Sequence, residues 1–157
     1  MSYELTKWLH IVSALLLFGT GLGSAFYKLM ADLHGDVRVL AVVNRHVVLA
    51  DWLFTTPTVI LQPVTGVYLL HQLGIPLLEP WAVIVYGLYA LAGICWLPVV
   101  WLQIRMRDLA IAARENNTPP PAAYWRLQRA WFALGWPAFI ALLAAMWLMV
   151  DKPDFTF

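Results

Sequence analysis

Charged residues are scarce in this chain: of its 157 residues, 12% are Asp, Glu, Lys or Arg, whereas 62% are hydrophobic. A water-soluble domain carries about twice that share of charge, and a disordered chain is far more polar. Ten basic residues against nine acidic ones give a net charge of +1. That balance excludes the basic surface of nucleic-acid-binding proteins. The sequence therefore predicts an integral membrane protein with no nucleic-acid partner.

Cysteine and lysine are almost missing as well. Cys95 is the only cysteine, so it cannot form an intramolecular disulfide, and we expect it to pack as a small apolar side chain. No lysine lies between Lys28 and Lys152. The five methionines form no cluster, so soft ligands for copper are few.

Four apolar stretches are long enough to cross a bilayer, whose hydrocarbon core of about 30 Å requires about 20 helical residues. They cover residues 5–30, 46–70, 81–102 and 131–150. The first is longer than a signal-peptide core and lacks an Ala-x-Ala cleavage pattern, so we expect it to be retained. The predicted fold class is all-α, a single four-helix transmembrane bundle over residues 1–157.

Arginines indicate the orientation of this bundle. They flank the first and third connections, whereas the second connection has neither Lys nor Arg. Because basic connections face the cytoplasm, we predict that both termini are periplasmic and that the protein lies in a bacterial cytoplasmic (inner) membrane. The third connection is a predicted cytoplasmic linker over residues 108–125, with three consecutive prolines at residues 119–121.

A stripe of polar residues runs through the second apolar stretch. Asp51, Thr55, Thr58, Gln62 and Thr65 follow at spacings of four, three, four and three residues, so they share one face of a helix. Such groups are costly against lipid and should face protein, a cofactor or water. We interpret this polar stripe as the interior of the bundle and as the wall of an intramembrane polar site.

Two prolines interrupt the same stretch. Pro57 and Pro63 remove two backbone donors and leave carbonyl groups near the bilayer midplane without their helical partners. The neighbouring threonines, Gln62, an ion or water would have to satisfy those carbonyls.

A second polar stripe begins at His10 and Ser13 in the first apolar stretch, and we expect it to face the first stripe. It continues through Thr20, Ser24 and Tyr27. A neutral imidazole can ligate haem iron or copper; a histidine that only hydrogen-bonds to a neighbour is the structural alternative. His71 lies near the same boundary and would allow a two-histidine site, although it is off the polar face.

An aromatic face in the third stretch is a candidate wall for a flat ligand. It comprises Tyr86, Tyr89, Gly93, Trp96 and Gln103, and ordinary packing is the alternative explanation. The cofactor-binding set that we predict is His10, Ser13, Thr55, Thr58, Gln62, Thr65, Tyr86 and Tyr89.

Asp51 lies near the predicted cytoplasmic boundary, at a depth similar to that of several arginines. A buried carboxylate there should take up a proton or pair with a cation, which predicts a structural charge cluster. Its members are Arg45, Asp51, Arg105, Arg107 and Arg129. Surplus arginines would bind lipid phosphate or haem propionates.

Longer segments carry a resemblance to a known family. They are LH at 9–10, LFGTGLGSA at 17–25, ADWLFT at 50–55, QPVTG at 62–66, CWLPVVWLQIRMR at 95–107 and LMVDKP at 148–153. These segments resemble the DUF2269 family of predicted bacterial integral membrane proteins. More distantly, the chain looks like the CopD-like group, which includes copper-resistance membrane proteins and HemJ-type protoporphyrinogen oxidases.

The distant resemblance implies a role for one residue. In HemJ-type proteins a histidine early in the first helix is associated with haem, and His10 is the position that corresponds to it. The lysine that those proteins use in a later helix has no counterpart here, so the resemblance implies haem binding rather than protoporphyrinogen oxidation.

These sequence features and resemblances are compatible with three alternative functions. The first is a haem-linked or otherwise redox-linked site, with haem b bound by His10 as axial ligand and a redox partner in the membrane. The second is a non-enzymatic membrane component that binds lipid or a partner subunit, or forms a homo-oligomer. The third is copper handling as in CopD-like proteins. The sequence does not decide whether a reaction is catalysed.

Overall fold

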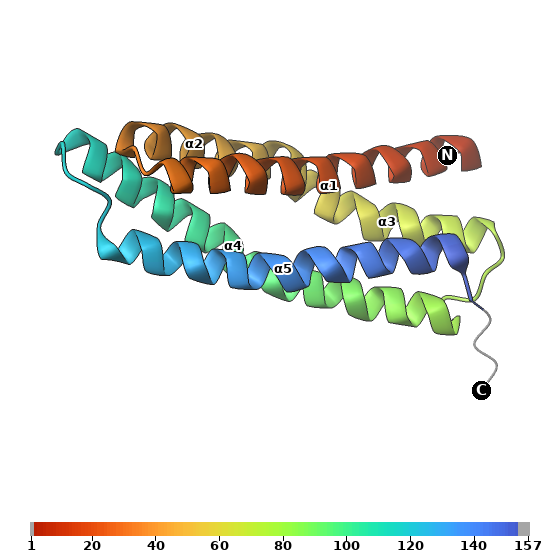
Figure 1. Cartoon of the computed structure of the whole chain (residues 1–157). Helices are drawn as coiled ribbons and strands as arrows, with labels where there is room; N and C mark the ends of the chain where they lie inside the picture. The colour runs from red at the N-terminus through yellow and green to blue at the C-terminus, as the bar shows by residue number, and fades with distance from the viewer. Residues whose placement is uncertain (1, 154–157) are drawn as a thin grey trace.

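The computed structural model describes residues 2–153 as a bundle of long helices that run along one common direction (Figure 1). The elements in chain order are α1 (Tyr3–His34), α2 (Val37–Ala50), the π-helical turn η1 (Asp51–Thr55), α3 (Thr56–Gln72), α4 (Pro80–Glu115) and α5 (Ala122–Asp151). Because α2, η1 and α3 form one continuous apolar helix, four helices are long and apolar enough to cross a membrane. The predicted all-α, four-span fold is confirmed.

Two helices extend beyond the predicted apolar stretches. The second spanning helix begins at Val37 rather than at residue 46, because the Asp36 carboxylate caps it by accepting the Arg38 N–H at 2.7 Å. Leu40 and Ala41 are buried within that first part of α2. The third spanning helix, α4, continues past its apolar part to Glu115 and ends before the Asn and Pro residues, as its helix-forming sequence predicts. The connection to α5 is therefore confined to residues 116–121, within the predicted linker over 108–125.

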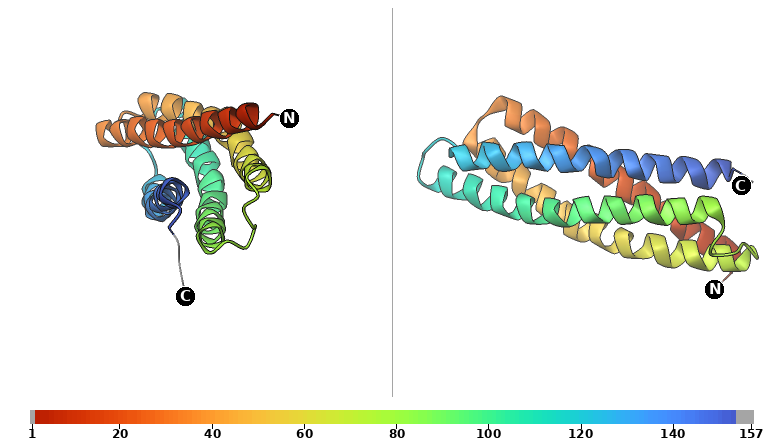
Figure 2. Two further views of the ribbon diagram at one scale, coloured as in Figure 1. Left: turned by 90° about the vertical axis from the view of Figure 1, so that its right-hand side faces the viewer. Right: turned by 90° about the horizontal axis from the view of Figure 1, so that it is seen from below.

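The helices do not all pack against one another. α1 packs on α2, η1 and α3, whereas α5 packs on α4, and α2 joins the two halves by packing on α4. Seen from the end, α1 lies across the top of the bundle and α5 lies below α1, separated from it (Figure 2, left). The seam between α1 and α5 is therefore the least closed side of the molecule.

A buried polar network joins α1, α2 and α5 at the end of the bundle where α4 meets α5. The Tyr124 hydroxyl donates to Asp32 Oδ1 at 2.5 Å and accepts from Asn44 Nδ2 at 2.9 Å. Lys28 Nζ pairs with Asp32 Oδ2 at 2.7 Å. All four side chains are buried, Lys28 and Tyr124 completely. In this Tyr124 network every charge has a partner, which makes its burial tolerable.

The π-helical turn η1 follows from the threonines and the proline after it. Pro57 has no N–H to donate, and the Thr56 N–H bonds to the Asp51 carbonyl, one residue further back than in an α-helix. The Thr56 hydroxyl donates to the same carbonyl at 3.0 Å, and the Thr58 hydroxyl donates to the Phe54 carbonyl at 2.8 Å. The two threonine hydroxyls thus add donors to the carbonyls of Asp51 and Phe54 on either side of the interruption, not to the Leu53 carbonyl that an N–H at position 57 would have bonded to.

Removing the Tyr124 hydroxyl should destabilise the bundle. Tyr124→Phe leaves Asn44 and Asp32 each short of one buried hydrogen bond, which costs about 1–3 kcal/mol. We expect a lower midpoint of thermal unfolding in detergent. Tyr27→Phe is the matched control, because the Tyr27 side chain is exposed. An equal midpoint for the two variants would contradict a stabilising role for the network.

Candidate functional site

The predicted polar stripe faces the interior of the bundle, but its two ends have different surroundings: Gln62 and Thr65 contact α1, and Asp51 and Thr55 line a cavity. All five of its residues are buried. Near the end of the bundle that carries the termini, Gln62 Nε2 donates to the His10 carbonyl at 2.9 Å and to Ser13 Oγ at 2.7 Å. Gln62 and Thr65 therefore hold α3 against α1, and this part of the two stripes meets face to face as expected.

His10 is oriented by this contact. Its Nδ1 lies 2.7 Å from Thr65 Oγ1, and the Thr65 hydroxyl donates its hydrogen to the Leu61 carbonyl at 2.6 Å. Nδ1 must then be the donor, which leaves the lone pair on Nε2. His10 is only partly buried, and it offers a single nitrogen for an additional partner.

The rest of the second stripe departs from the prediction. Thr20, Ser24 and Tyr27 line a hollow between α1 and α2 that also includes His46, and Ser24 in addition faces the cavity that Asp51 and Thr55 line. His71 is exposed. The direct hydrogen bonds between the two stripes are those of His10 and Ser13 with Gln62 and Thr65.

The carbonyl released by Pro63 has a partner that the sequence analysis did not foresee. Tyr89 of α4 donates its hydroxyl to the Val59 carbonyl at 2.7 Å, and Val59 is the residue to which an N–H at position 63 would have bonded. Tyr89 therefore joins α4 to the interrupted α3. Tyr86, expected beside it, is exposed and points away from the interior.

A cavity of about 360 Å³ lies between α1, the region of η1 and α3, α4 and α5. Its lining is mostly apolar and aromatic, with polar groups from Asp51, Thr55, Tyr89, Trp96 and Gln103. Four residues of the predicted aromatic face, all but Tyr86, thus contribute to its wall. Neither His10 nor Ser13 is part of the lining.

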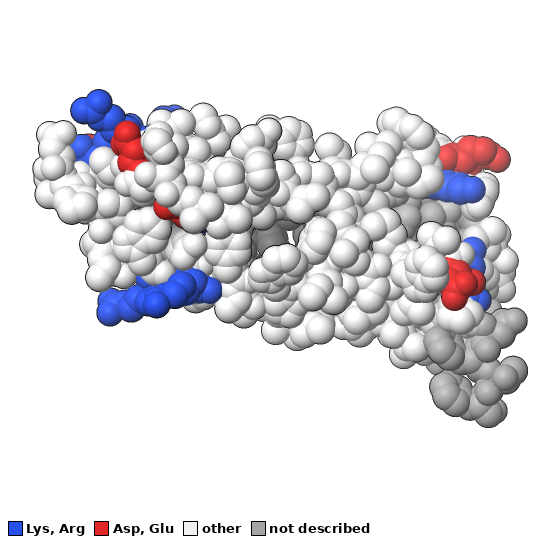
Figure 3. Space-filling view, in the orientation of Figure 1, with Lys and Arg blue, Asp and Glu red and all other residues white. Residues whose placement is uncertain are grey.

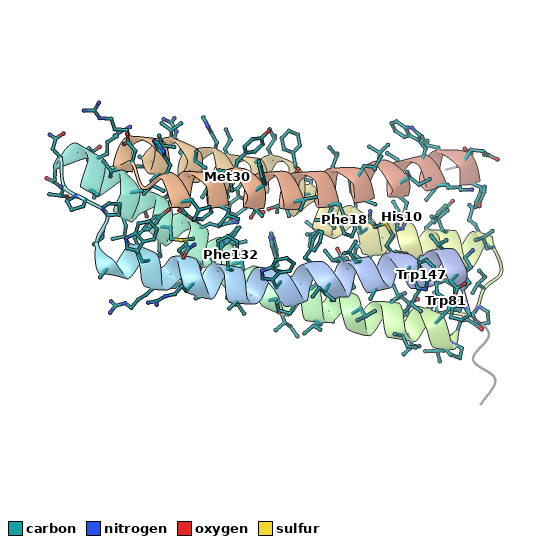
Figure 4. All side chains as sticks on the ribbon, viewed as in Figure 1. His10, Phe18, Met30, Trp81, Phe132 and Trp147 are labelled. Carbon is teal, nitrogen blue, oxygen red and sulfur yellow. The ribbon has the colours of Figure 1, made fainter. Side chains whose placement is uncertain are left out.

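The cavity lies along the open seam between α1 and α5. Towards the termini, the rings of Phe18 and Phe139 close the seam in an edge-on contact with centroids 6.0 Å apart. Towards the other end, the Tyr124 network closes it. Between these two contacts the surface is hollowed (Figure 3), and Phe18 and Phe132 lie on either side of the gap between the ribbons (Figure 4). The hollow opens onto the uncharged middle zone of the surface, between the two charged ends, where lipid would surround the protein (Figure 3).

Asp51 does not form the predicted pair with an arginine. Within residues 2–153, ion pairs join Lys28 to Asp32 and Arg107 to the exposed Asp108, and none involves Asp51. Its carboxylate instead accepts from Trp96 Nε1 at 3.4 Å and from the Thr55 hydroxyl. Arg45, Arg105 and Arg129 are exposed. The turn η1 directs Asp51 towards the cavity, while these arginine side chains extend outwards from their helices.

Some residues around the cavity were not identified from the sequence. Trp131, Trp136 and Phe139 of α5 belong to its wall, and nothing in their spacing separates them from ordinary membrane aromatics. The burial of Lys28 was not predicted either. The spacing of Lys28 and Asp32, four residues apart on one helix, was the available signal for a buried ion pair.

Metal ligands do not gather in the part of the chain that the structure describes. No group of three or more His, Cys, Asp or Glu side chains there is placed to hold a metal ion, and Cys95 is buried and free. The predicted haem and copper functions therefore depend on His10 and stay predictions.

The uncharged middle zone and the four spanning helices agree with what sequence comparison finds. Residues 4–153 match the DUF2269 family, described as a predicted integral membrane protein. The chain belongs to the DUF2269 family. No curated protein and no solved structure matches this DUF2269 protein significantly. The resemblance to CopD-like and HemJ-type proteins thus gains no support from the comparisons.

Proposed function

We propose that this DUF2269 protein is a membrane component that binds one small, largely apolar molecule in the cavity between α1 and α5. The volume of about 360 Å³ falls within the range of about 300–1,000 Å³ that is typical of small-molecule sites. The wall combines apolar and aromatic side chains with a few polar groups, as such sites do. The proposal is a form of the lipid-binding alternative, with the cavity between α1 and α5 as the proposed site.

The observation that carries the proposal is the open seam. α1 and α5 meet at the Phe18–Phe139 contact and at the Tyr124 network, and the cavity lies between the two. Protein interiors are close-packed, and a gap of this size leaves its wall without dispersion contacts. A molecule that enters sideways from the bilayer would restore those contacts.

The distribution of charge supports an orientation for the site. Charged side chains lie at the two ends of the bundle and leave an uncharged belt between them (Figure 3). The end where α1 meets α2 and α4 meets α5 carries Arg38, Arg45, Arg105, Arg107, Arg114, Arg126 and Arg129. We propose that this end faces the cytoplasm of a bacterial inner membrane and that both termini are periplasmic.

Filling the cavity should abolish binding. Gly93 of α4 lines the cavity, and a Cβ at this position would meet nothing within 4 Å, so Gly93→Phe should place its ring in empty space. We expect saturable binding of radiolabelled dodecanol to the unmodified protein in nanodiscs, above that of empty nanodiscs. We expect no saturable binding to Gly93→Phe.

The matched control is Gly87→Phe on the same helix. Gly87 is exposed, is not part of the cavity wall, and also has open space around its Cβ position. It should bind dodecanol like the unmodified protein. Equal binding by the Gly93 and Gly87 variants, or no saturable binding to any of the three proteins, would overturn the proposed function.

Haem b on His10 is the second candidate, and one observation favours it. The Nδ1 of His10 is fixed by Thr65, and ligating histidines are commonly oriented in this way through their other nitrogen. The cavity, however, is not lined by His10, so a haem on Nε2 would lie outside it. His10 would supply one axial ligand, but the cavity would not enclose the haem. For that reason we place the haem proposal second.

An absorption spectrum separates the two candidates. Under the haem proposal, the protein purified from haem-replete cells shows a Soret band, with α and β bands after reduction with dithionite, and His10→Ala loses them. A colourless protein would exclude haem b on His10 and would leave the cavity proposal intact.

A further inference from the structure

We propose that the molecule bound in this cavity is a cationic amphiphile whose ammonium group pairs with Asp51. This inference rests on the proposed function and adds the chemical class of the ligand. It follows from three features of the cavity: a carboxylate without a cation, a carboxamide without a partner, and aromatic rings around them.

Asp51 is a buried carboxylate that forms no ion pair with a described Lys or Arg side chain, whereas the buried Lys28 and Asp32 pair with each other. It is buried in the cavity wall, and no Lys or Arg side chain is part of that wall. The Trp96 contact of 3.4 Å is long for a hydrogen bond. A carboxylate has about four acceptor sites, so after the Trp96 and Thr55 donors Asp51 retains acceptor capacity. A buried unpaired carboxylate is unfavourable, and a ligand cation would compensate it.

Gln103 provides an independent indication of a polar ligand. It is 5% exposed and lines the same cavity. No hydrogen bond joins its carboxamide to another described residue, although the carboxamide atoms are not fully buried, and Trp131 Nε1 in the same wall is a fully buried donor without a partner within residues 2–153. Gln62 and Asn44 do form hydrogen bonds. A buried carboxamide normally has partners. A polar group on the ligand would satisfy it.

The aromatic side chains suit a cation better than an anion. Trp96, Trp136 and Phe132 line the cavity, and the faces of such rings attract ammonium groups. Trp131 already receives a cation in this way, since Lys28 Nζ lies 5.4 Å from its ring centroid. An anionic head group would instead meet the Asp51 carboxylate and no compensating positive charge.

The position of the polar groups also gives the ligand a direction. Asp51 and Gln103 lie towards the end of the bundle where α4 meets α5, and the Phe18–Phe139 contact lies towards the termini. The head group would therefore lie beside Asp51. The apolar chain would extend along the seam between α1 and α5 into lipid.

Two probes of equal chain length test this assignment. Dodecanol and dodecylammonium share an alkyl chain and differ in the charge of the head group. We would measure saturable binding of each to the protein in nanodiscs and correct it for partition into empty nanodiscs. We expect dodecylammonium to bind at least about tenfold more tightly than dodecanol, because a close ion pair in a medium of low dielectric constant is favourable.

Asp51→Asn should remove this preference by lowering the affinity for dodecylammonium to about that for dodecanol. Asp108→Asn is the matched control, because Asp108 is exposed, lies outside the cavity, and reports any effect of lost surface charge. Gln103→Leu gives a second test that keeps Asp51; it should weaken binding of dodecylammonium by severalfold.

The outcomes are distinguishable. Equal affinity of the unmodified protein for the two probes, or a preference that survives Asp51→Asn, would overturn the ammonium assignment and leave the proposed function standing. Absence of saturable dodecanol binding to the unmodified protein would overturn the proposed function itself.

Discussion

The buried network around Tyr124 determines how far α1 lies from α5, and the cavity depends on that separation. Lys28 and Asp32 of α1 bond to Tyr124 of α5, and Asn44 of α2 donates to the same hydroxyl, so α1 is fixed at one end of the seam. At the other end the Phe18–Phe139 contact brings the same two helices together. Between them α1 packs on the α2–α3 side and α5 on α4. Because α1 and α5 touch at the Tyr124 network and at the Phe18–Phe139 contact but pack on other helices, the stretch between those two contacts stays open towards lipid.

The interior of a membrane contains no water to satisfy free backbone groups, and this constraint shapes the rest of the site. Pro57 and Pro63 each remove a backbone donor. Threonine hydroxyls donate to the neighbouring Asp51 and Phe54 carbonyls beside Pro57, and the Tyr89 hydroxyl donates to the carbonyl released by Pro63. The resulting π-helical turn η1 carries Asp51 and Thr55 to the cavity wall. On either side of Pro63, Gln62 and Thr65 hold α1. The prolines thus divide one polar stripe between a structural contact and a candidate binding site.

The sequence was sufficient for much of this arrangement. The four spans, the inward face of Asp51 to Thr65 and the contact of His10 and Ser13 with that face all follow from helical periodicity, which depends on local spacing. The Asp51–arginine pair did not form, because similar depth in a membrane does not decide which way a side chain points. Tyr124 and Lys28 could not be paired from the sequence, since they are far apart in the chain and their contact depends on how α1 and α5 cross. The α5 side of the cavity was unforeseen for the same reason, because the cavity exists only where α1 and α5 fail to pack.

The central claim is that molecules of the bilayer reach the interior between α1 and α5. The most direct measurement is photo-crosslinking in a bilayer that contains a diazirine-bearing alkyl alcohol, with the modified residues located by mass spectrometry. Leu91 and Ile94 of α4 are exposed, whereas Ala92, between them, is 4% exposed and lines the cavity. We predict modification at Ala92 as well as at its exposed neighbours, and its loss in the Gly93→Phe variant. Modification confined to Leu91, Ile94 and other outward-facing residues would contradict the account.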